Sequence, residues 1–311
     1  MPRIDAVLPL LPRDLQRFSI LARSLERFMA DLGTLFIVVP DRAHDELVSA
    51  LAPFARSLPI RVIKEQQWVP EMAQLRHLPG WYKQQLVKLA GAEFVASEFF
   101  LTLDADVVCT RAVGYEQLVP GGRAPCHVIQ GCDHPGWYAG AEAVLSLKAK
   151  RQNILHNVTP CVWARAGVLE LIEHLNRVAL ERPYASGLRG LQQRLFFTQH
   201  RLGPHRARPP WRGWLGASRP WAEYATYFTF LEATGRYDRY HFDSEQCVYD
   251  IERSVWQKAV QIEDLDPEPL FRSGGPPYFV VIQSNSGIDP SRTWRVLEPW
   301  LGPAQGAGPR A

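Results

Sequence analysis

The stretch that decides the fold is "FFLTLDAD", residues 99–106. Its apolar run predicts a strand that is buried on both faces, as in a parallel sheet covered by helices. Asp104 and Asp106 then end the run. Residues i and i+2 of an extended chain point the same way, about 6–7 Å apart at Cα. Either the two carboxylates form a functional site, or they cap the backbone at a strand-to-turn corner.

Strands and helices alternate before this stretch. The sequence predicts strands at 4–12, 34–40 and 60–65, and helices at 14–29, 41–54 and 81–97. Such alternation is typical of a doubly wound α/β sheet. Ligands of these sheets bind at the carboxyl ends of the strands, which is where Asp104 and Asp106 lie.

The second half of the sequence is less regular. It predicts helices at 166–180 and 220–235, a late strand at 278–287, and a Pro/Gly/Arg-rich loop at 201–219. Ser218 is the expected cap of the helix at 220–235, Pro220 lies in its first turn, and Gly235 ends it. No linker divides the chain, so we expect a single domain over 1–301 and a disordered tail over 302–311.

Composition narrows the class of protein. The 311 residues carry a net charge of only +3, which gives no general case for binding nucleic acid or membranes. Five cysteines without a C-x-x-C pair favour a reduced intracellular protein. The N-terminus lacks the apolar core of a secretory signal, and no stretch is long enough to span a membrane. We expect a cytoplasmic protein that could still touch the inner face of a membrane.

The aspartate pair is suited to a hard cation. A small bend after the strand lets the carboxylates of Asp104 and Asp106 converge on one ion. Mg²⁺ and Mn²⁺ prefer carboxylate oxygens and keep positions open for phosphate oxygens. A divalent metal is therefore the expected cofactor.

At this point the sequence resembles a family. "LTLDADVV" resembles the D-x-D segment of GT-A-fold glycosyltransferases. Together with this segment, "WYKQQLVKL", "NVTPCVWAR", "WAEYATYFTFLEATGRY" and "VIQSNSG" follow an order that resembles an uncharacterised bacterial group of GT-A-like proteins, a domain of unknown function. The resemblance covers roughly residues 4–300. It implies a Rossmann-like mixed sheet flanked by helices, with a nucleotide-binding half at 1–110 and an acceptor half at 111–301.

The resemblance also implies an activity. GT-A enzymes move a sugar from a nucleotide-diphosphate-sugar, here expected to be a UDP-sugar, to an acceptor hydroxyl, for example on a bacterial surface glycan. Asp104 would face the ribose or the metal, and Asp106 would bind the metal. The family often has a late metal ligand, usually His, where this chain has Asn285. The carbonyl oxygen of Asn285 is the candidate third ligand.

One helix face carries further candidates for the donor site. Trp81, Gln84, Gln85 and Lys88 lie at helical spacing opposite the apolar face. By resemblance, Lys88 would offset diphosphate charge, and the Gln84 and Gln85 amides would bond hydroxyls of the sugar or ribose. The alternative is an ordinary solvated face.

Arg13 and Glu223 complete the candidate site. Arg13 lies just before a helix N-terminus, which favours an anion, although it could be a plain surface residue. Glu223 begins an aromatic helix and resembles the carboxylate base that an inverting transferase needs. Binding of the acceptor is the alternative role for Glu223, and the helix dipole is expected to keep it ionised.

Two other functions compete with glycosyl transfer. A nucleotidyltransferase of related fold normally has a Gly-rich loop after the first strand, which "LPLLPRD" lacks. A non-enzymatic protein could instead bind phosphates, nucleic acid or a membrane surface through the loop at 201–219, which is alternatively an active-site lid. The loop residues concerned are Arg201, Arg206, Arg208, Trp211, Arg212, Trp214 and Arg219.

Several single residues are further, weaker candidates for the functional site. Thr159, Pro160, His241 and Asp243 are weaker site candidates. His156, His200 and His205 lack metal-ligand spacing and are expected to be incidental.

Overall fold

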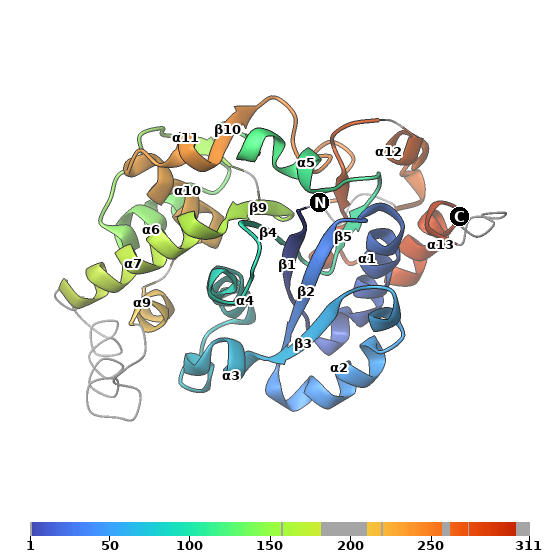
Figure 1. The fold of residues 1–311 in the computed structure, drawn as a ribbon, viewed down its shortest axis with the longest axis horizontal. Coiled ribbons are helices and arrows are strands. Elements are labelled where there is room, and N and C mark those ends of the chain that lie inside the picture. Colours follow the sequence, from blue (N-terminus) through green and yellow to red (C-terminus); the bar gives the residue numbers. More distant parts are fainter. Residues whose placement is uncertain are drawn as a thin grey trace.

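A computed structural model describes residues 2–156, 158–181, 210–218, 220–256, 262–272 and 274–302. Its centre is a five-stranded sheet (Figure 1). The strand order is β3 (Ile60–Lys64), β2 (Leu32–Val39), β1 (Ile4–Pro9), β4 (Phe99–Thr102) and β9 (Cys161–Ala164). The first four strands run parallel, whereas β9 runs antiparallel to β4. The predicted α/β fold with a mixed sheet is confirmed.

Helices cover both faces of the sheet (Figure 1). One side carries α1 (Leu15–Phe28), α2 (His44–Leu51) and α13 (Pro290–Leu301), and the other carries α4 (Gly80–Ala90) and α7 (Arg165–Glu181). Their apolar stripes fit helical periodicity and pack on strands that are buried on both faces. No helix in the described parts of the chain is long and apolar enough to cross a membrane.

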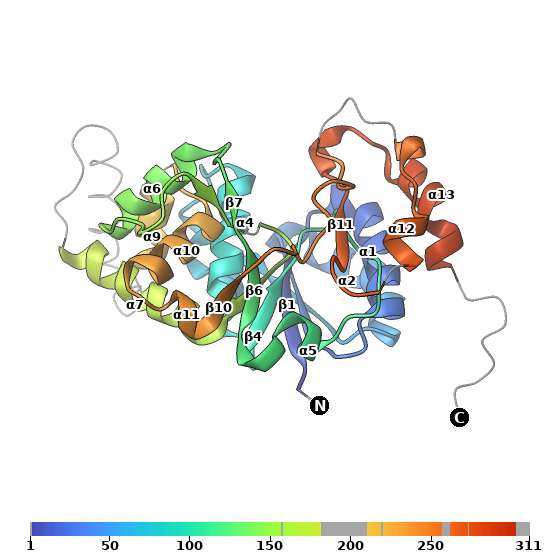
Figure 2. The same cartoon turned by 90° about the horizontal axis from the view of Figure 1, so that it is seen from above.

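The remaining helices and strands lie around this sheet and its covering helices. They are α3 (Glu65–Trp68), β5 (Val107–Cys109), α5 (Tyr115–Leu118), β6 (Ala124–His127), β7 (Ile129–Gln130), α6 (Pro135–Leu145), β8 (Ile154–Leu155), α9 (Trp211–Ala217), α10 (Glu223–Ala233), α11 (Tyr237–Tyr240), β10 (His241–Ser244), α12 (Glu268–Arg272) and β11 (Phe279–Val281). Figure 2 shows α6, α7, α9 and α10 on one side of β1 and β4, and β11, α12 and α13 on the other. One hydrophobic cluster includes residues from before and after residue 110, among them Val7, Phe100, Trp163 and Tyr227.

A long-range strand pair places the late segment beside the aspartates. β5 directly follows Asp106 and pairs antiparallel with β11, with Val107 opposite Val281. The Ile282 N–H then donates to the Asp106 carbonyl oxygen at 2.9 Å. This pairing brings the short 3-10 turn Ser284–Ser286 to the end of β4.

Several predicted boundaries need correction. β4 ends at Thr102 rather than at Asp106, so both aspartates lie in the turn after the strand. The helix predicted at 220–235 begins at Glu223, and neither Ser218 nor Pro220 belongs to its first turn. Gly235, with a φ of 71°, does follow its end as predicted, because this left-handed conformation suits glycine.

The loop predicted at 201–219 is partly a buried helix. Residues Trp211–Ala217 form α9, and Trp211, Arg212 and Trp214 are all buried. Arg212 pairs with Glu71 and Glu93 inside the protein. These side chains are therefore packing groups, and the prediction that they form a binding face or lid is wrong. Arg201, Arg206, Arg208 and Arg219, together with tail residues 303–311, lie outside the described residues.

Candidate functional site

A cavity of about 210 Å³ opens at the carboxyl ends of β1 and β4. It is lined by Pro9, Asp14, Arg17, Trp81, Gln84, Asp104, Ala105, Asp106, Thr159, Trp256, Val281, Gln283, Ser284 and Asn285. This edge is where the chain leaves parallel strands, so side chains from several loops converge there. The cavity thus joins the predicted aspartate pair to α1, α4 and the late turn.

Asp104 is held by a buried lysine. Lys88 on α4 is only 3% exposed, and its Nζ lies 2.9 Å from Asp104 Oδ1 and 3.1 Å from Oδ2. The same Nζ lies 3.2 Å from Glu223 Oε1 and donates to the Tyr224 hydroxyl at 3.0 Å. Lys88 therefore links the end of β4 to the start of α10.

The ionisation of Lys88 and the ionisation of its partners Asp104, Glu223 and Tyr224 depend on one another. Burial alone would lower the pKa of Lys88, but its three partners outweigh burial and hold this pKa well above its usual value. Burial raises the pKa of Glu223, which is 4% exposed, while the Lys88 ammonium opposes that rise. The ion pair is therefore what allows the Glu223 carboxylate to carry a charge inside the protein.

Asp106, two residues after Asp104, lines the same cavity. Its Oδ2 accepts a hydrogen bond from the Ser284 N–H at 2.6 Å. Burial and the negative charge of Asp104 raise the pKa of Asp106 to about 6, and the bonds from Ser284 oppose this rise. The site thus concentrates more negative charge than its own cations neutralise.

The donors present fit a hard divalent cation. The carboxylates of Asp104, Asp106 and Glu223 against the Lys88 ammonium leave two formal negative charges, and the Asp14–Arg17 pair on the cavity wall adds none. One divalent ion would balance these two charges. Asn285 lines the same cavity and adds an amide oxygen. The described part of the chain has no group of three His, Cys, Asp or Glu placed to hold a metal. Two carboxylates and an amide oxygen are donors of the kind that Mg²⁺ and Mn²⁺ accept.

Of the four residues predicted to share one face of α4, two line the cavity and two are buried. Trp81 and Gln84 line the cavity, as expected for that face. Gln85 is buried beneath it, where its Oε1 accepts from the Glu223 N–H at 2.9 Å. Lys88 is also buried, so neither Gln85 nor Lys88 belongs to a solvated face.

Arg17, which sequence reasoning missed, takes the place expected of Arg13. The Arg13 side chain is 78% exposed and does not line the cavity. Arg17 does line it, and its Nη2 donates to the carbonyl oxygens of Ser284 at 3.4 Å and Ile288 at 3.2 Å. The available signal was the helical spacing, because Arg17 lies one turn after Arg13.

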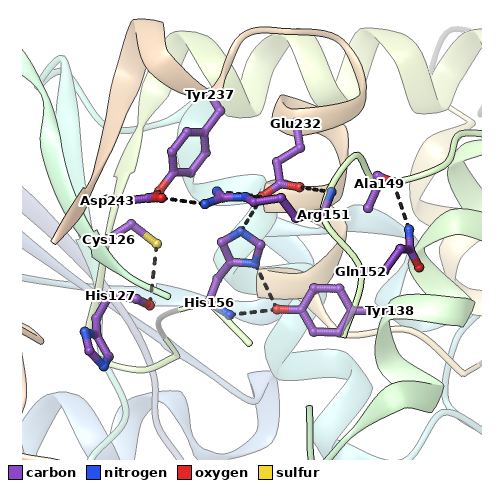
Figure 3. Close-up of polar contacts among 10 residues, drawn as sticks. All are labelled: Cys126, His127, Tyr138, Ala149, Arg151, Gln152, His156, Glu232, Tyr237 and Asp243. Atoms are coloured by element: carbon purple, nitrogen blue, oxygen red, sulfur yellow. Dashed lines mark hydrogen bonds and ion pairs between the residues drawn. The ribbon is translucent and has the colours of Figure 1, made fainter. Parts of the chain in front are cut away.

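A second polar cluster lies beyond α10 and does not line the cavity (Figure 3). His156 is buried between the Tyr138 hydroxyl, 3.0 Å from its Nδ1, and Glu232 Oε1, 2.8 Å from its Nε2. Arg151 joins Glu232 to Asp243. His156 is thus a buried, fully bonded group outside the cavity, and the prediction that it is incidental to the site stays a prediction. His200 and His205 lie outside the described residues.

The structure also places the four weaker site candidates named from the sequence. Burial lowers the pKa of His241 to about 3, so it is a neutral core residue bonded to the Tyr227 hydroxyl at 2.8 Å. Asp243 belongs to the second polar cluster. Thr159 lines the cavity, whereas Pro160 does not.

Comparison with known proteins gives distant likenesses. No curated protein matches the sequence significantly. Similar solved structures include mouse xyloside xylosyltransferase 1 in its apo form, with a TM-score of 0.45 and 10% identity, covering 93% of this chain and 100% of that one. Another is the galactosyltransferase LgtC in complex with donor and acceptor sugar analogues, with a TM-score of 0.41 and 9% identity. It covers 95% of this chain and 96% of that one.

A third likeness covers less of the chain. It is glucosyl-3-phosphoglycerate synthase from Mycobacterium tuberculosis in complex with Mn²⁺, UDP and glucosyl-3-phosphoglycerate, with a TM-score of 0.30 and 16% identity, covering 65% of this chain and 67% of that one. Likenesses this distant do not transfer an activity. A family model matches residues 1–304, nearly the whole sequence, and its description is "Family of unknown function (DUF6492)". The chain therefore belongs to this family of unknown function.

Proposed function

We propose that this protein is a glycosyltransferase that moves a sugar from a nucleotide-diphosphate-sugar to a hydroxyl group of a saccharide acceptor. The observation that carries the proposal is the cavity at the ends of β1 and β4, where Asp104 and Asp106 meet Arg17 and Asn285. The sequence resemblance to GT-A glycosyltransferases supports it. A non-enzymatic binder has no need of the aspartate pair at this edge of the sheet.

Asp104, Asp106 and Asn285 are the residues that would hold Mn²⁺ or Mg²⁺. When bound, such an ion would balance the negative charge of the donor diphosphate and of the departing nucleotide. Arg17 adds a guanidinium on the same wall, and two carbonyl oxygens and the Asp14 carboxylate hold it in place. Gln84 offers an amide to hydroxyl groups of the donor.

A small recess of about 50 Å³ beside the cavity is where this proposal places one edge of the nucleotide base. It shares Pro9 and Gln84 with the cavity and continues along the ends of β1 and β2. Its walls are mostly apolar, with Leu10, Leu11 and Val38 among them. A flat aromatic base would bury that edge there while the diphosphate reaches Asp104. A UDP-sugar is the donor to test first.

Lys88 and Glu223 have a supporting role in this proposal. Lys88 fixes the Asp104 carboxylate, and Glu223 fixes Lys88. The sequence-based prediction that Glu223 is the acceptor base stays a prediction. Glu223 does not line the cavity, and Lys88 and Gln85 bond its first turn, so we propose that it is a positioning residue.

Thermal shifts test the donor site. The protein is melted with UDP, GDP, CMP or dTDP, each with and without Mn²⁺, and a ligand at 100 times its Kd should add about 2.7 kcal/mol to the free energy of unfolding. We expect one nucleotide to stabilise the protein only when Mn²⁺ is present. Asp106→Asn should remove this effect, whereas Asp45→Asn, at an exposed carboxylate on α2, should retain it. No nucleotide-dependent shift in the wild type would refute the proposal.

A further inference from the structure

Three aromatic rings form a shelf at the mouth of the cavity. Trp81 on α4 is 42% exposed, and its ring centroid lies 5.6 Å from that of Trp137 on α6. His134, just before α6, stacks on Trp137 at 3.9 Å with an interplanar angle of 24°. We call Trp81, Trp137 and His134 the aromatic shelf.

The shelf is continuous with the proposed reaction site. Trp81 lines the cavity together with Asp104 and Asp106, so its ring borders the same space as the carboxylates. Among the described residues, four large apolar side chains are strongly exposed, and Trp81 is the member of that group that lines this cavity. An exposed tryptophan that adjoins two further rings at the edge of a polar cavity is suited to contact with a ligand.

The aromatic shelf lies next to the recess proposed for the base without lining it, since Gly80, the neighbour of Trp81, belongs to that recess. That recess is lined by residues from the ends of β1 and β2 and from α4, and neither Trp81 nor Trp137 lines it. Trp137 instead belongs to α6, which packs on the start of α10. Trp81 thus borders the cavity, and Trp137 extends the aromatic shelf from there toward α6, which is the side from which a second substrate would reach a bound donor.

The helix that carries Trp137 is anchored on two sides. Tyr138, next to Trp137, accepts a hydrogen bond from the His156 N–H at 2.9 Å, and its hydroxyl contacts His156 Nδ1 (Figure 3). Gly140 lets α6 approach the chain before α10 so closely that an added Cβ would lie 1.6 Å from the Pro220 carbonyl oxygen. This anchoring holds the backbone at Trp137 in place, and a preorganised surface loses less entropy when a ligand binds.

We propose that the aromatic shelf binds a pyranose ring of the acceptor, so that the acceptor of this enzyme is a saccharide; this inference rests on the proposed function. One face of a pyranose exposes C–H groups that pack on an indole, while its hydroxyls need hydrogen-bond partners at the rim. The structure offers both. The indole N–H groups of Trp81 and Trp137 make no hydrogen bond within the described residues, and Gln84 and Asp14 line the adjoining wall.

Saturation-transfer NMR tests the shelf without any turnover. The probes are the methyl α- and β-pyranosides of glucose, galactose, mannose and N-acetylglucosamine, added with UDP and Mn²⁺ present. We expect transfer to the C–H protons of one ring face of at least one probe. Trp81→Ala and Trp137→Ala should weaken its binding about tenfold or more, equivalent to about 1.4 kcal/mol.

Two variants control for loss of folding. Trp81→Phe keeps an aromatic face and should retain most of the glycoside binding. Leu180→Ala, at an exposed apolar side chain on α7, should bind glycosides like the wild type. Circular dichroism confirms that each variant is folded.

Nucleotide binding separates this inference from the proposed function. If the wild type shows Mn²⁺-dependent nucleotide binding but no pyranoside signal, the shelf inference is overturned and the glycosyltransferase proposal stands. If Trp81→Ala loses nucleotide rather than glycoside binding, the ring stacks on the base, and the inference is also overturned. Pyranoside binding without any nucleotide binding would support the shelf and refute the proposed donor site.

Discussion

Lys88→Met should destabilise the protein strongly and in a pH-dependent way. Methionine keeps much of the length and apolar volume of the lysine stem but removes the ammonium. Glu223, which is 4% exposed, then loses its ion-pair partner at 3.2 Å, and the Tyr224 hydroxyl loses a donor at 3.0 Å. Breaking a buried pair from one side costs about 3–5 kcal/mol. This is a large part of the 5–15 kcal/mol that is typical of a whole domain.

The pH dependence follows from the raised pKa of Glu223. Burial and Asp104 already raise this pKa, and the loss of Lys88 removes the main opposing charge. The folded variant then holds a proton on Glu223 at pH values where the unfolded chain, with a pKa of about 4.3, has released it. Stability of the variant should therefore fall as pH rises through the folded-state pKa of Glu223. The destabilisation relative to wild type should be smaller at pH 5.5 than at pH 7.5.

Urea unfolding at both pH values measures the effect. Lys88→Met combined with Glu223→Gln should be more stable than Lys88→Met alone at pH 7.5, because no unpaired carboxylate remains. Lys148→Met is the matched control, since the Lys148 side chain is 84% exposed and its ion pair with Glu142 should contribute less than about 1 kcal/mol. If Lys88→Met lies within about 1 kcal/mol of wild type at both pH values, the buried ion pair is not the support we describe.

Three further predictions test other parts of the site. The folded-state pKa of Asp106 is raised to about 6, so the stability that its protonated form contributes should be lost as pH rises from about 4 to 6. Urea titrations should show this trend in the wild type but not in Asp106→Asn. At pH 7.5, Mn²⁺ should stabilise the wild type but not this variant. Gly140→Ala should lower the melting temperature, because the added Cβ would lie 1.6 Å from the Pro220 carbonyl oxygen. Gly136→Ala on the same helix should not, because the space around its Cβ is open. Equal melting temperatures of the two variants would contradict the close packing of α6. Glu223→Gln should leave the acid limb of the pH–kcat profile in place if Glu223 only positions Lys88, whereas loss of that limb with turnover lowered by about 10²–10⁴ would identify it as the base.

The sequence by itself determined the local elements and the location of the aspartate pair. Apolar runs bounded by turns marked β1 to β4, and helical spacing marked α1, α4 and α7, because both signals depend only on neighbouring residues. The position of Asp104 and Asp106 followed from the same rule, since the end of a parallel strand is the binding edge of the sheet.

The sequence signal was weaker where several local explanations compete. The face of α4 with Gln84 and Lys88 was identified, but its pattern does not tell whether polar side chains meet solvent or a buried partner. Arg13 and Arg17 have the same charge one turn apart, and only the rotation of α1 against the late turn selects Arg17.

Only the tertiary structure decided the electrostatics of the site. Lys88 and Glu223 are separated by 135 positions, and no local pattern pairs them. The same holds for His156 with Glu232, and for Arg212, which looked like part of an exposed loop but is buried against Glu71. Burial of a charge is decided by which distant element covers it, and the pKa of the charge follows from that cover and from the partner it brings.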